Sequence, residues 1–395
     1  SIQKGDAVDG YSVFTTRYLE RLSQSANISL QSSNNITLDL QGDTLNFATS
    51  GRTLSLTAGN QISTASTGTI TTNNGAISLT GTNGININHA FTINSGSAAT
   101  TLTTNNAAIN VNAALNVNGA TTLSAGTGTI TTAATITNTN NLTLKSDNMT
   151  IGASLAGTGA LYIAPGTNSR TLNFGTATGA LDWNTTEISY IGANKQMYLG
   201  IWGTTTGNVD IGGFSLNNNM AIYNMGNLTV SAPVNFMGKT LDVGLGTGTV
   251  NINAALTSVG GNLTLRSGMG GVSIGLAGAA GNMAISSAML DNITDGWNSI
   301  TFGNGSGQNI VMNAYSNWRD PVVFNSGSAS SATITVSGAQ STAAGSNARF
   351  TFSGPTTFNA DVNTTNSTAS AGIGTITLGN YAHTLSANII TGDAN

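Results

Sequence analysis

The hexapeptide TGTITT at residues 67–72 occurs again at 127–132, and close variants follow as TGTVNI at 247–252 and IGTITL at 373–378. Successive copies begin 60, 120 and 126 residues apart, which are close to multiples of about 20–21 residues. An internal period of this size is typical of proteins in which similar units stack in one direction. The sequence therefore predicts a solenoid.

A second pair of segments supports the same period. NLTLKS at 141–146 returns as NLTLRS at 262–267, at an offset of 121 residues, which indicates that a block of this length is duplicated. One coil of about 21 residues that holds three short strands fits all of these intervals.

Triplets in which two apolar residues flank a polar one recur between segments rich in Asn, Gly, Ser and Thr. Alternation with period two places the apolar side chains on one face of a strand and the polar side chains on the other. Tight bends must connect these strands, because successive triplets lie close together in the chain. Examples are Ile28/Leu30, Ile36/Leu38, Leu45/Phe47, Leu54/Leu56, Ile77/Leu79, Ile85/Ile87, Ile109/Val111, Leu115/Val117, Leu142/Leu144 and Leu161/Ile163.

Such strands can pair as hairpins or wind into stacked coils. Hairpin sheets have edges that proteins usually protect with charged residues or Pro, but this chain has 11 Lys and Arg, 15 Asp and Glu and four Pro among 395 residues. Stacked coils pair each strand with its equivalents above and below, at about 4.8 Å, and so satisfy the backbone. We predict an all-β parallel β-helix with aliphatic ladders inside and Asn side chains that hydrogen-bond between coils.

Three segments, 15–30, 185–199 and 286–302, break the period of two. Each begins with Ser or Thr, which favours a helix N-cap, and places apolar residues three positions apart. We interpret them as helices of one or two turns inserted into the coils, the first of which could cover the N-terminal end of the core. The apolar pairs are Leu19/Leu22, Ile188/Ile191 and Leu290/Ile293.

These features divide the chain into four parts. Residues 1–26 form an N-terminal segment with the amphipathic helix, and residues 27–180 form a regular β-solenoid. Residues 181–325 continue the solenoid with helical inserts and an aromatic-rich face, and residues 326–395 form the C-terminal coils.

Composition excludes several classes of function. The net charge is −4 and no basic run occurs, so neither nucleic acid nor an anionic membrane is an expected partner. No apolar run approaches the roughly 18–20 residues that a membrane helix needs. Cysteine is absent, which excludes disulfides and Cys-based metal sites. We expect no cofactor and no bound metal.

The sequence also argues against an enzyme. The chain has two histidines, His89 and His383, and no thiol, so a nucleophilic triad is not expected. Carboxylates could serve a glycan-cleaving β-helix if they were paired on one face. The candidates are Asp39/Asp43, Asp291/Asp295 and Arg319/Asp320, which we interpret as isolated or solvated side chains.

Aromatic residues gather in the second half of the chain. Exposed flat rings on a rigid scaffold suit stacking against sugars; alternatively, the rings pack the helical inserts against the coil wall. The candidate glycan-stacking residues are Trp183, Trp202, Trp297 and Trp318.

With its TGTITT and NLTL coils and its helical inserts, the chain resembles the repetitive regions of filamentous-haemagglutinin-like exoproteins and other giant β-strand-repeat bacterial surface proteins. The resemblance implies a right-handed parallel β-helix, export to the surface of a Gram-negative-type bacterium, and a role in adhesion or matrix building.

Two functional hypotheses follow. The first is a structural or adhesive extracellular fibre protein, a rigid rod that stacks head to tail into a filament. The second is a glycan-binding or glycan-cleaving β-helix that uses residues 183–320. The stacking contact would join the C-terminal strands to the N-terminal coil, through Ile28, Leu30, Ile376, Leu378, Ile389 and Ile390.

Overall fold

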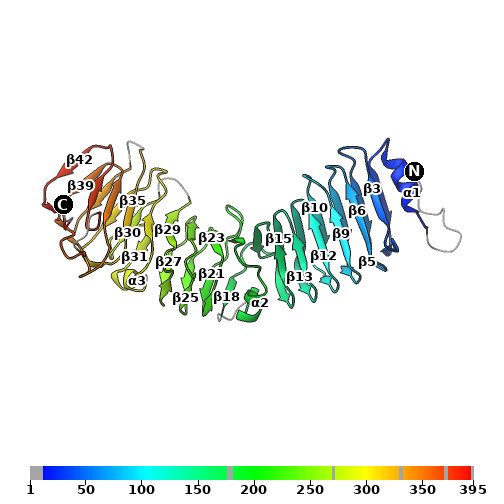
Figure 1. Cartoon of the computed structure of the whole chain (residues 1–395), viewed down its shortest axis with the longest axis horizontal. Helices are drawn as coiled ribbons and strands as arrows, with labels where there is room; N and C mark the ends of the chain where they lie inside the picture. Colours follow the sequence, from blue (N-terminus) through cyan, green and yellow to red (C-terminus); the bar gives the residue numbers. More distant parts are fainter. Residues whose placement is uncertain (1–11, 176–180, 269–271, 329–331, 369–371, 393–395) are drawn as a thin grey trace. The chain divides into compact units, whose positions relative to one another are not determined.

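The computed structural model describes residues 12–175, 181–268, 272–328, 332–368 and 372–392 (Figure 1). Short strands and three short helices make up this part of the chain. All ladders between the named strands in these ranges are parallel. The predicted β-solenoid is confirmed. The chain forms two compact units, the first from Ser1–Thr167 with Ala180–Lys195 and the second from Asn168–Gly179 with Gln196–Asn395.

In the first unit, three strands per coil form three stacks of parallel strands, as the sequence predicts. The first stack contains β1 (Ile28–Ser32), β4 (Leu54–Ala58), β7 (Ile77–Gly81), β10 (Thr100–Thr104), β13 (Thr121–Thr132), β15 (Leu142–Ile151) and β17 (Leu161–Ala164). The second contains β2 (Ile36–Leu38), β5 (Gln61–Thr64), β8 (Gly84–Ile87) and β11 (Ile109–Val111), and continues in the second halves of β13 and β15. The third contains β3 (Thr44–Phe47), β6 (Gly68–Thr72), β9 (Phe91–Asn94), β12 (Leu115–Asn118), β14 (Ile136–Asn138) and β16 (Leu155–Gly157), and β19 (Leu181–Trp183) completes the strands of the unit.

The coils of the first unit vary in length. Register partners are 26 residues apart between Ile28 and Leu54, 21 apart between Thr100 and Thr121, and 19 apart between Leu142 and Leu161. The predicted interval of about 21 residues lies within this range, because the turns vary in length. Strand positions stay in register because insertions fall in the turns.

The second unit repeats this plan. Its first stack contains β20 (Gln196–Leu199), β23 (Asn219–Asn224), β26 (Leu241–Leu245), β29 (Asn262–Ser267), β32 (Ser299–Phe302), β35 (Val322–Asn325), β38 (Phe350–Ser353) and β41 (Ile376–Leu378). The second face carries β18 (Leu172–Gly175), β21 (Val209–Gly212), β24 (Leu228–Val230) and β27 (Val250–Ile252), then β30 (Ile274–Leu276), β31 (Met283–Ile285), β33 (Ile310–Met312), β36 (Ile334–Val336), β39 (Thr356–Phe358) and β42 (His383–Leu385). The third carries β22 (Phe214–Ser215), β25 (Val234–Asn235) and β28 (Leu256–Thr257), then β34 (Tyr315–Trp318), β37 (Gln340–Thr342), β40 (Val362–Asn363) and β43 (Ile389–Ile390).

The two cores use different side chains. In the first unit, Leu30, Leu56, Leu79, Leu102, Leu123, Leu144 and Ile163 form one aliphatic column in register. Toward the C-terminal end of the second unit, Phe302, Phe324 and Phe352 are in register and stack at centroid distances of 6.0 and 5.2 Å. The predicted ladders are present, but the second unit also uses a column of stacked rings.

The three predicted helical inserts are confirmed as α1 (Thr16–Ser23), α2 (Thr185–Ser189) and α3 (Ser287–Asp291). Thr15 and Ser286 are the N-caps of α1 and α3, while Asn184 caps α2 one residue before the predicted Thr. Glu187 of α2 completes a capping box, and its Oε1 accepts a hydrogen bond from the backbone N–H of Ile151 at 2.9 Å. A side chain of α2 thus accepts the hydrogen bond from the last N–H of β15.

Turn asparagines hydrogen-bond from coil to coil, as the sequence predicts. Asn83 Nδ2 donates to Asn60 Oδ1 at 3.1 Å, and Asn60 Nδ2 donates to Asn35 Oδ1 at 2.8 Å. Asn112 Nδ2 donates to Asn88 Oδ1 at 2.8 Å in the same way. These side-chain ladders stabilise turns that have few apolar contacts.

Candidate functional site

The C-terminal coil has three strand edges that no other strand pairs in the described ranges. β41, β42 and β43 pair on one side with β38, β39 and β40. Backbone bonds from Gly379 N to Phe352 O and from Ser386 N to Phe358 O also point back to the preceding coil. No strand of the described residues pairs with the opposite edges.

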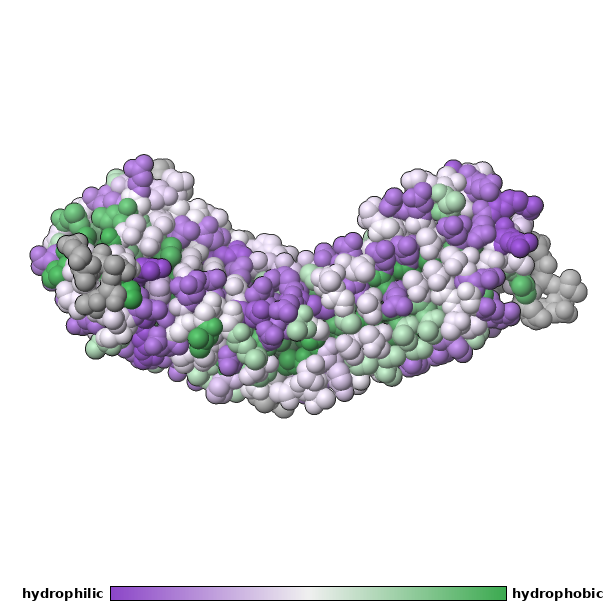
Figure 2. All heavy atoms as spheres, in the orientation of Figure 1, coloured by the Kyte–Doolittle hydropathy of each residue, from purple (hydrophilic) through white to green (hydrophobic). Residues whose placement is uncertain are grey.

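Apolar side chains are exposed at the same coil. Leu378 and Leu385 extend the columns of Phe352 and Phe358, which are fully buried, but are themselves 37% and 58% exposed. Ile390 is 41% exposed on the neighbouring strand. Figure 2 shows apolar residues gathered at this end of the second unit. We call the edges of β41, β42 and β43, with these three side chains, the C-terminal edge.

Charged residues are absent from this part of the sequence, since no Lys, Arg, Asp or Glu occurs between Asp361 and Asp393. Proteins commonly place charges or Pro on a free edge to prevent pairing with another chain. The C-terminal edge lacks this protection.

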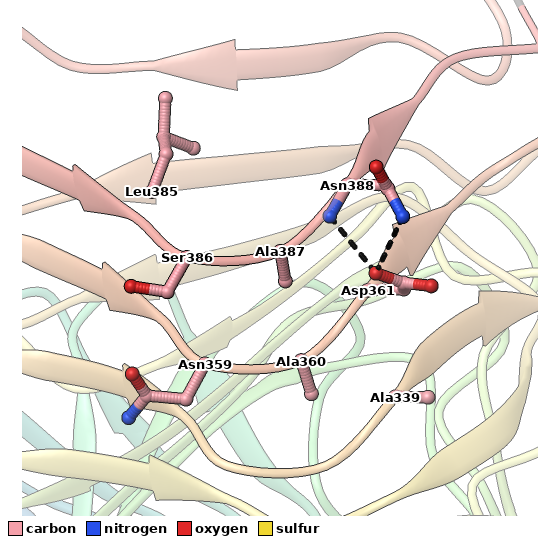
Figure 3. A pocket seen from close by; sticks show the side chains of 8 residues that line it. All are labelled: Ala339, Asn359, Ala360, Asp361, Leu385, Ser386, Ala387 and Asn388. Atoms are coloured by element: carbon pink, nitrogen blue, oxygen red, sulfur yellow. Dashed lines mark hydrogen bonds between the residues drawn. The ribbon is translucent and has the colours of Figure 1, made fainter.

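A shallow depression of about 710 Å³ lies beside this edge (Figure 3). It occupies the corner between β39 and β40 and the equivalent corner one coil later. Asp361 Oδ1 accepts hydrogen bonds from the backbone N and from Nδ2 of Asn388, at 2.8 and 3.2 Å. The residues that line the depression are Ala339, Asn359, Ala360, Asp361, Leu385, Ser386, Ala387 and Asn388.

The N-terminal coil of the first unit is different because α1 packs against β3 and β1. Leu19 of this helix is buried, and Glu20 Oε1 accepts a hydrogen bond from Asn46 N at 2.8 Å. The predicted stacking residue Ile28 is buried and Leu30 is half-buried, whereas Ile376 and Ile389 are half-buried in the last coil. The predicted contact therefore has one open side and one side on which a helix is packed.

Three of the four candidate glycan-stacking tryptophans are buried. Trp183 and Trp297 are completely buried, and Trp318 is 3% exposed. Trp318 packs edge-on against Phe302 and donates from Nε1 to Gln340 Oε1 at 3.0 Å. This corrects the expectation that these three rings face a sugar, because buried rings cannot stack against one.

Trp202, which is 39% exposed, belongs to an aromatic and charged cluster on the second unit. Its ring lies edge-on to Tyr223 at a centroid distance of 6.5 Å, and Tyr198 lies 5.8 Å from Tyr223. The Arg266 guanidinium lies over the Tyr223 ring at 5.2 Å and forms a two-pronged salt bridge with Asp242 at 2.9 Å. We call these five residues the Tyr223 cluster.

Hydrogen bonds tie the Tyr223 cluster together. Tyr223 Oη donates to Asp242 Oδ2 at 2.9 Å and accepts from Arg266 Nη2 at 3.1 Å. Burial and the bond to Asp242 raise the pKa of Tyr223, and the bond to Asp242 raises the pKa of Arg266. The sequence singled out Trp202 but not Asp242 or Arg266, which only the coil register brings beside the rings.

The acidic candidates are placed differently from the expected pairs. Asp39 and Asp43 are exposed, and Asp291 accepts hydrogen bonds from Tyr315 Oη and Asn317 Nδ2 at 3.0 and 2.8 Å. Burial and the bond to Asp291 raise the pKa of Tyr315.

Asp295 interacts electrostatically with Asp320 of the next coil. Asp320 is 1% exposed, and its Oδ1 accepts from Gly296 N at 2.9 Å. Burial and the neighbouring Asp295 carboxylate raise the pKa of Asp320 to about 7. The buried carboxyl joins two coils.

Both histidines bond to the backbone. His89 Nδ1 lies 3.1 Å from Thr64 O, and His383 Nε2 lies 2.9 Å from Gly379 O. Among the residues that the structure describes, no group of three or more acidic or histidine side chains could hold a metal ion. No helix in these ranges combines the length and the apolar character needed to cross a membrane.

Comparison with known proteins gives no relative for this chain: no family model, curated protein or solved structure matches it.

Proposed function

We propose that this protein is a structural β-solenoid that joins a second copy of itself through the C-terminal edge. One observation carries the proposal: the last coil combines three strands that each have one unpaired edge among the described residues with exposed Leu378 and Leu385. Pairing these edges would satisfy their free backbone groups and remove apolar surface from water.

The difference between the two ends favours a tail-to-tail contact. A head-to-tail contact must displace α1 and expose Leu19, which is buried against the first coil. Two C-terminal edges can instead meet about a two-fold axis, with their strands antiparallel. Such an isologous contact uses the same surface on both copies and closes at two, whereas a head-to-tail contact propagates into a filament.

The proposal includes an extracellular, adhesive and non-catalytic role. Its support is compositional: charged residues make up 7% of the chain and Cys is absent. The resemblance to bacterial β-strand-repeat surface proteins supports the same role. In this role the solenoid supplies length and a rigid surface, and the joint at the C-terminal edge doubles that length.

Sedimentation velocity of the 395-residue protein over a range of concentrations tests the self-association. We expect a monomer–dimer equilibrium that is lost in the double variant Leu378→Lys/Leu385→Lys, because two desolvated charges would face each other across the contact. Val259→Lys is the matched control, since Val259 is 74% exposed elsewhere on the second unit; this variant should dimerise normally.

Two results would contradict the proposal. A protein that stays monomeric at every concentration has no such joint. Growth beyond the dimer into long particles would favour head-to-tail stacking instead.

Glycan binding is the second candidate function, and the Tyr223 cluster is the observation that favours it. No arrangement of carboxylates around the cluster favours glycan cleavage, since its single carboxylate, Asp242, is engaged by Arg266.

A further inference from the structure

We infer that the Tyr223 cluster is a carbohydrate-binding site for a neutral polysaccharide chain. This inference rests on the second candidate function above, whose ligand class it specifies, and does not depend on the structural role. The cluster draws on the successive strands β20, β23, β26 and β29 and the loop that follows β20. Neighbouring strands are about 4.8 Å apart, a spacing comparable with the length of one sugar ring, so the cluster can contact consecutive sugars.

Trp202 and Tyr198 supply the stacking surface, while Arg266 covers the face of Tyr223. Trp202 is 39% exposed, and Tyr198 and Tyr223 are half-buried and lie on the outward side of their strands. Aromatic rings that are apolar on the face and polar at the edge suit the C–H face of a pyranose. Contact with protein already restricts each ring, so less side-chain entropy is lost when a ligand binds.

Two glycines let Trp202, Tyr223 and the Arg266 guanidinium approach the backbone of the coil closely. A Cβ atom at Gly268 would lie 1.3 Å from the Trp202 ring, and one at Gly244 would lie 3.2 Å from Tyr223 and 3.5 Å from Arg266 Nη1. Larger residues at these positions would lift the side chains away from the strands. The shape of the Tyr223 cluster therefore depends on these two glycines as well as on the rings.

The salt bridge leaves hydrogen-bonding capacity beside the rings. A carboxylate has about four acceptor positions and a guanidinium has five donors. Asp242 accepts one bond at Oδ1 and two at Oδ2, and Arg266 donates through Nε and Nη2. One acceptor position on Oδ1 and the Nη1 donors are unused among the described residues. A neighbouring acceptor and donor pair match adjacent hydroxyl groups of a sugar.

The charges argue against two other ligand classes. A quaternary ammonium or methylated lysine would need the face of Tyr223, but the Arg266 guanidinium already covers it. Stacked nucleic acid bases would bring phosphates that need several unpaired cations, whereas Arg266 is neutralised by Asp242. A neutral polysaccharide needs neither.

The test uses the full chain and an array of soluble neutral oligosaccharides of glucose, mannose and galactose, with oligogalacturonate as the charged comparison. The best neutral binder is then titrated calorimetrically and in acrylamide quenching, because Trp202 is the exposed tryptophan of the described residues. We expect saturable binding that shields Trp202 from acrylamide. Trp202→Ala and Gly268→Ala should each weaken binding by about tenfold or more, and Trp202→Phe by less than about threefold.

Tyr162→Ala is the matched control, because Tyr162 is an outward-facing, half-buried strand tyrosine of the first unit. Its binding should equal that of the wild type, and circular dichroism shows that each variant is folded. The inference is overturned if none of the neutral oligosaccharides binds saturably, if only oligogalacturonate binds, or if Trp202→Ala binds as the wild type does. Sedimentation is measured on the same variants, so failure of this site and failure of the C-terminal joint are separately visible.

Discussion

Phe324→Ala perturbs the part of the core in which the second unit differs most from a simple aliphatic solenoid. Phe324 is 1% exposed and occupies the middle of the Phe302–Phe324–Phe352 column. Trp318 lies edge-on to it at 5.7 Å, and Phe350 lies at 6.1 Å. The substitution removes a ring that contacts four other rings.

The expected cost is near the top of the range for buried phenylalanine. Phe→Ala substitutions in cores cost about 3–5 kcal/mol, and the cost rises with the volume of the cavity that remains. Parallel pairing to β32 and β38 holds the backbone of β35 on both sides, so the site cannot collapse easily. We therefore expect a loss of about 4–5 kcal/mol.

Urea unfolding followed by tryptophan fluorescence measures this loss, because Trp318 contacts the substituted ring. The chain has two compact units, so the transition that reports Trp318 is fitted separately if two transitions occur. Val259→Ala, at a 74% exposed position, is the control and should change stability by less than about 0.5 kcal/mol. A loss below about 1.5 kcal/mol for Phe324→Ala would refute the aromatic column as a packed core.

Three further predictions test other parts of the structure. Glu187→Ala should cost about 1–3 kcal/mol in urea unfolding of the first unit, because it leaves the N–H of Ile151 without its acceptor; an unchanged midpoint would argue against the cap. The pKa of Asp320 is about 7 in the fold against an ordinary 3.8, so its contribution to stability is complete below about pH 4 and is lost as pH rises through 7. Asp320→Asn should therefore raise the melting temperature at pH 8.5 relative to the wild type, and its melting temperature should change less between pH 5 and 8.5. If the melting temperatures of the variant and the wild type change in parallel with pH, the raised pKa of Asp320 is contradicted. Ser55→Cys/Ser78→Cys should form a disulfide, since the two residues are register partners in adjacent coils and the chain contains no other Cys; no crosslink would indicate a different register.

The solenoid and its inserts could be predicted because their signals are local. Period-two triplets, Ser or Thr N-caps and a recurring 20–21-residue interval each depend on residues close together in the chain or on simple repetition. The same alternation also contains the reason why Trp183 is buried, because Leu181 and Trp183 lie on one face of a strand and are both buried. We predicted a sugar-stacking role for Trp183 because it is aromatic. Its position on the apolar face of the strand instead predicts that it is buried.

The Tyr223 cluster and the Asp295–Asp320 pair could not be predicted because they depend on the register between coils. Tyr223 and Arg266 are on the same outward position of strands two coils apart, with Gly244 between them. Coil lengths range from 19 residues in the first unit to 37 between Leu263 and Ile300, where α3 is inserted. With intervals this uneven, a mean period does not identify which side chains become neighbours.

Spin labels on single cysteines introduced at Thr384 or at Ser29 test the C-terminal joint most directly. Thr384 is exposed on β42 of the last coil, and Ser29 is exposed on β1 of the first. Tail-to-tail pairing predicts intermolecular dipolar coupling between two Thr384 labels and none between two Ser29 labels. Coupling found only when Thr384-labelled and Ser29-labelled protein are mixed, or no coupling with any label, would contradict the account.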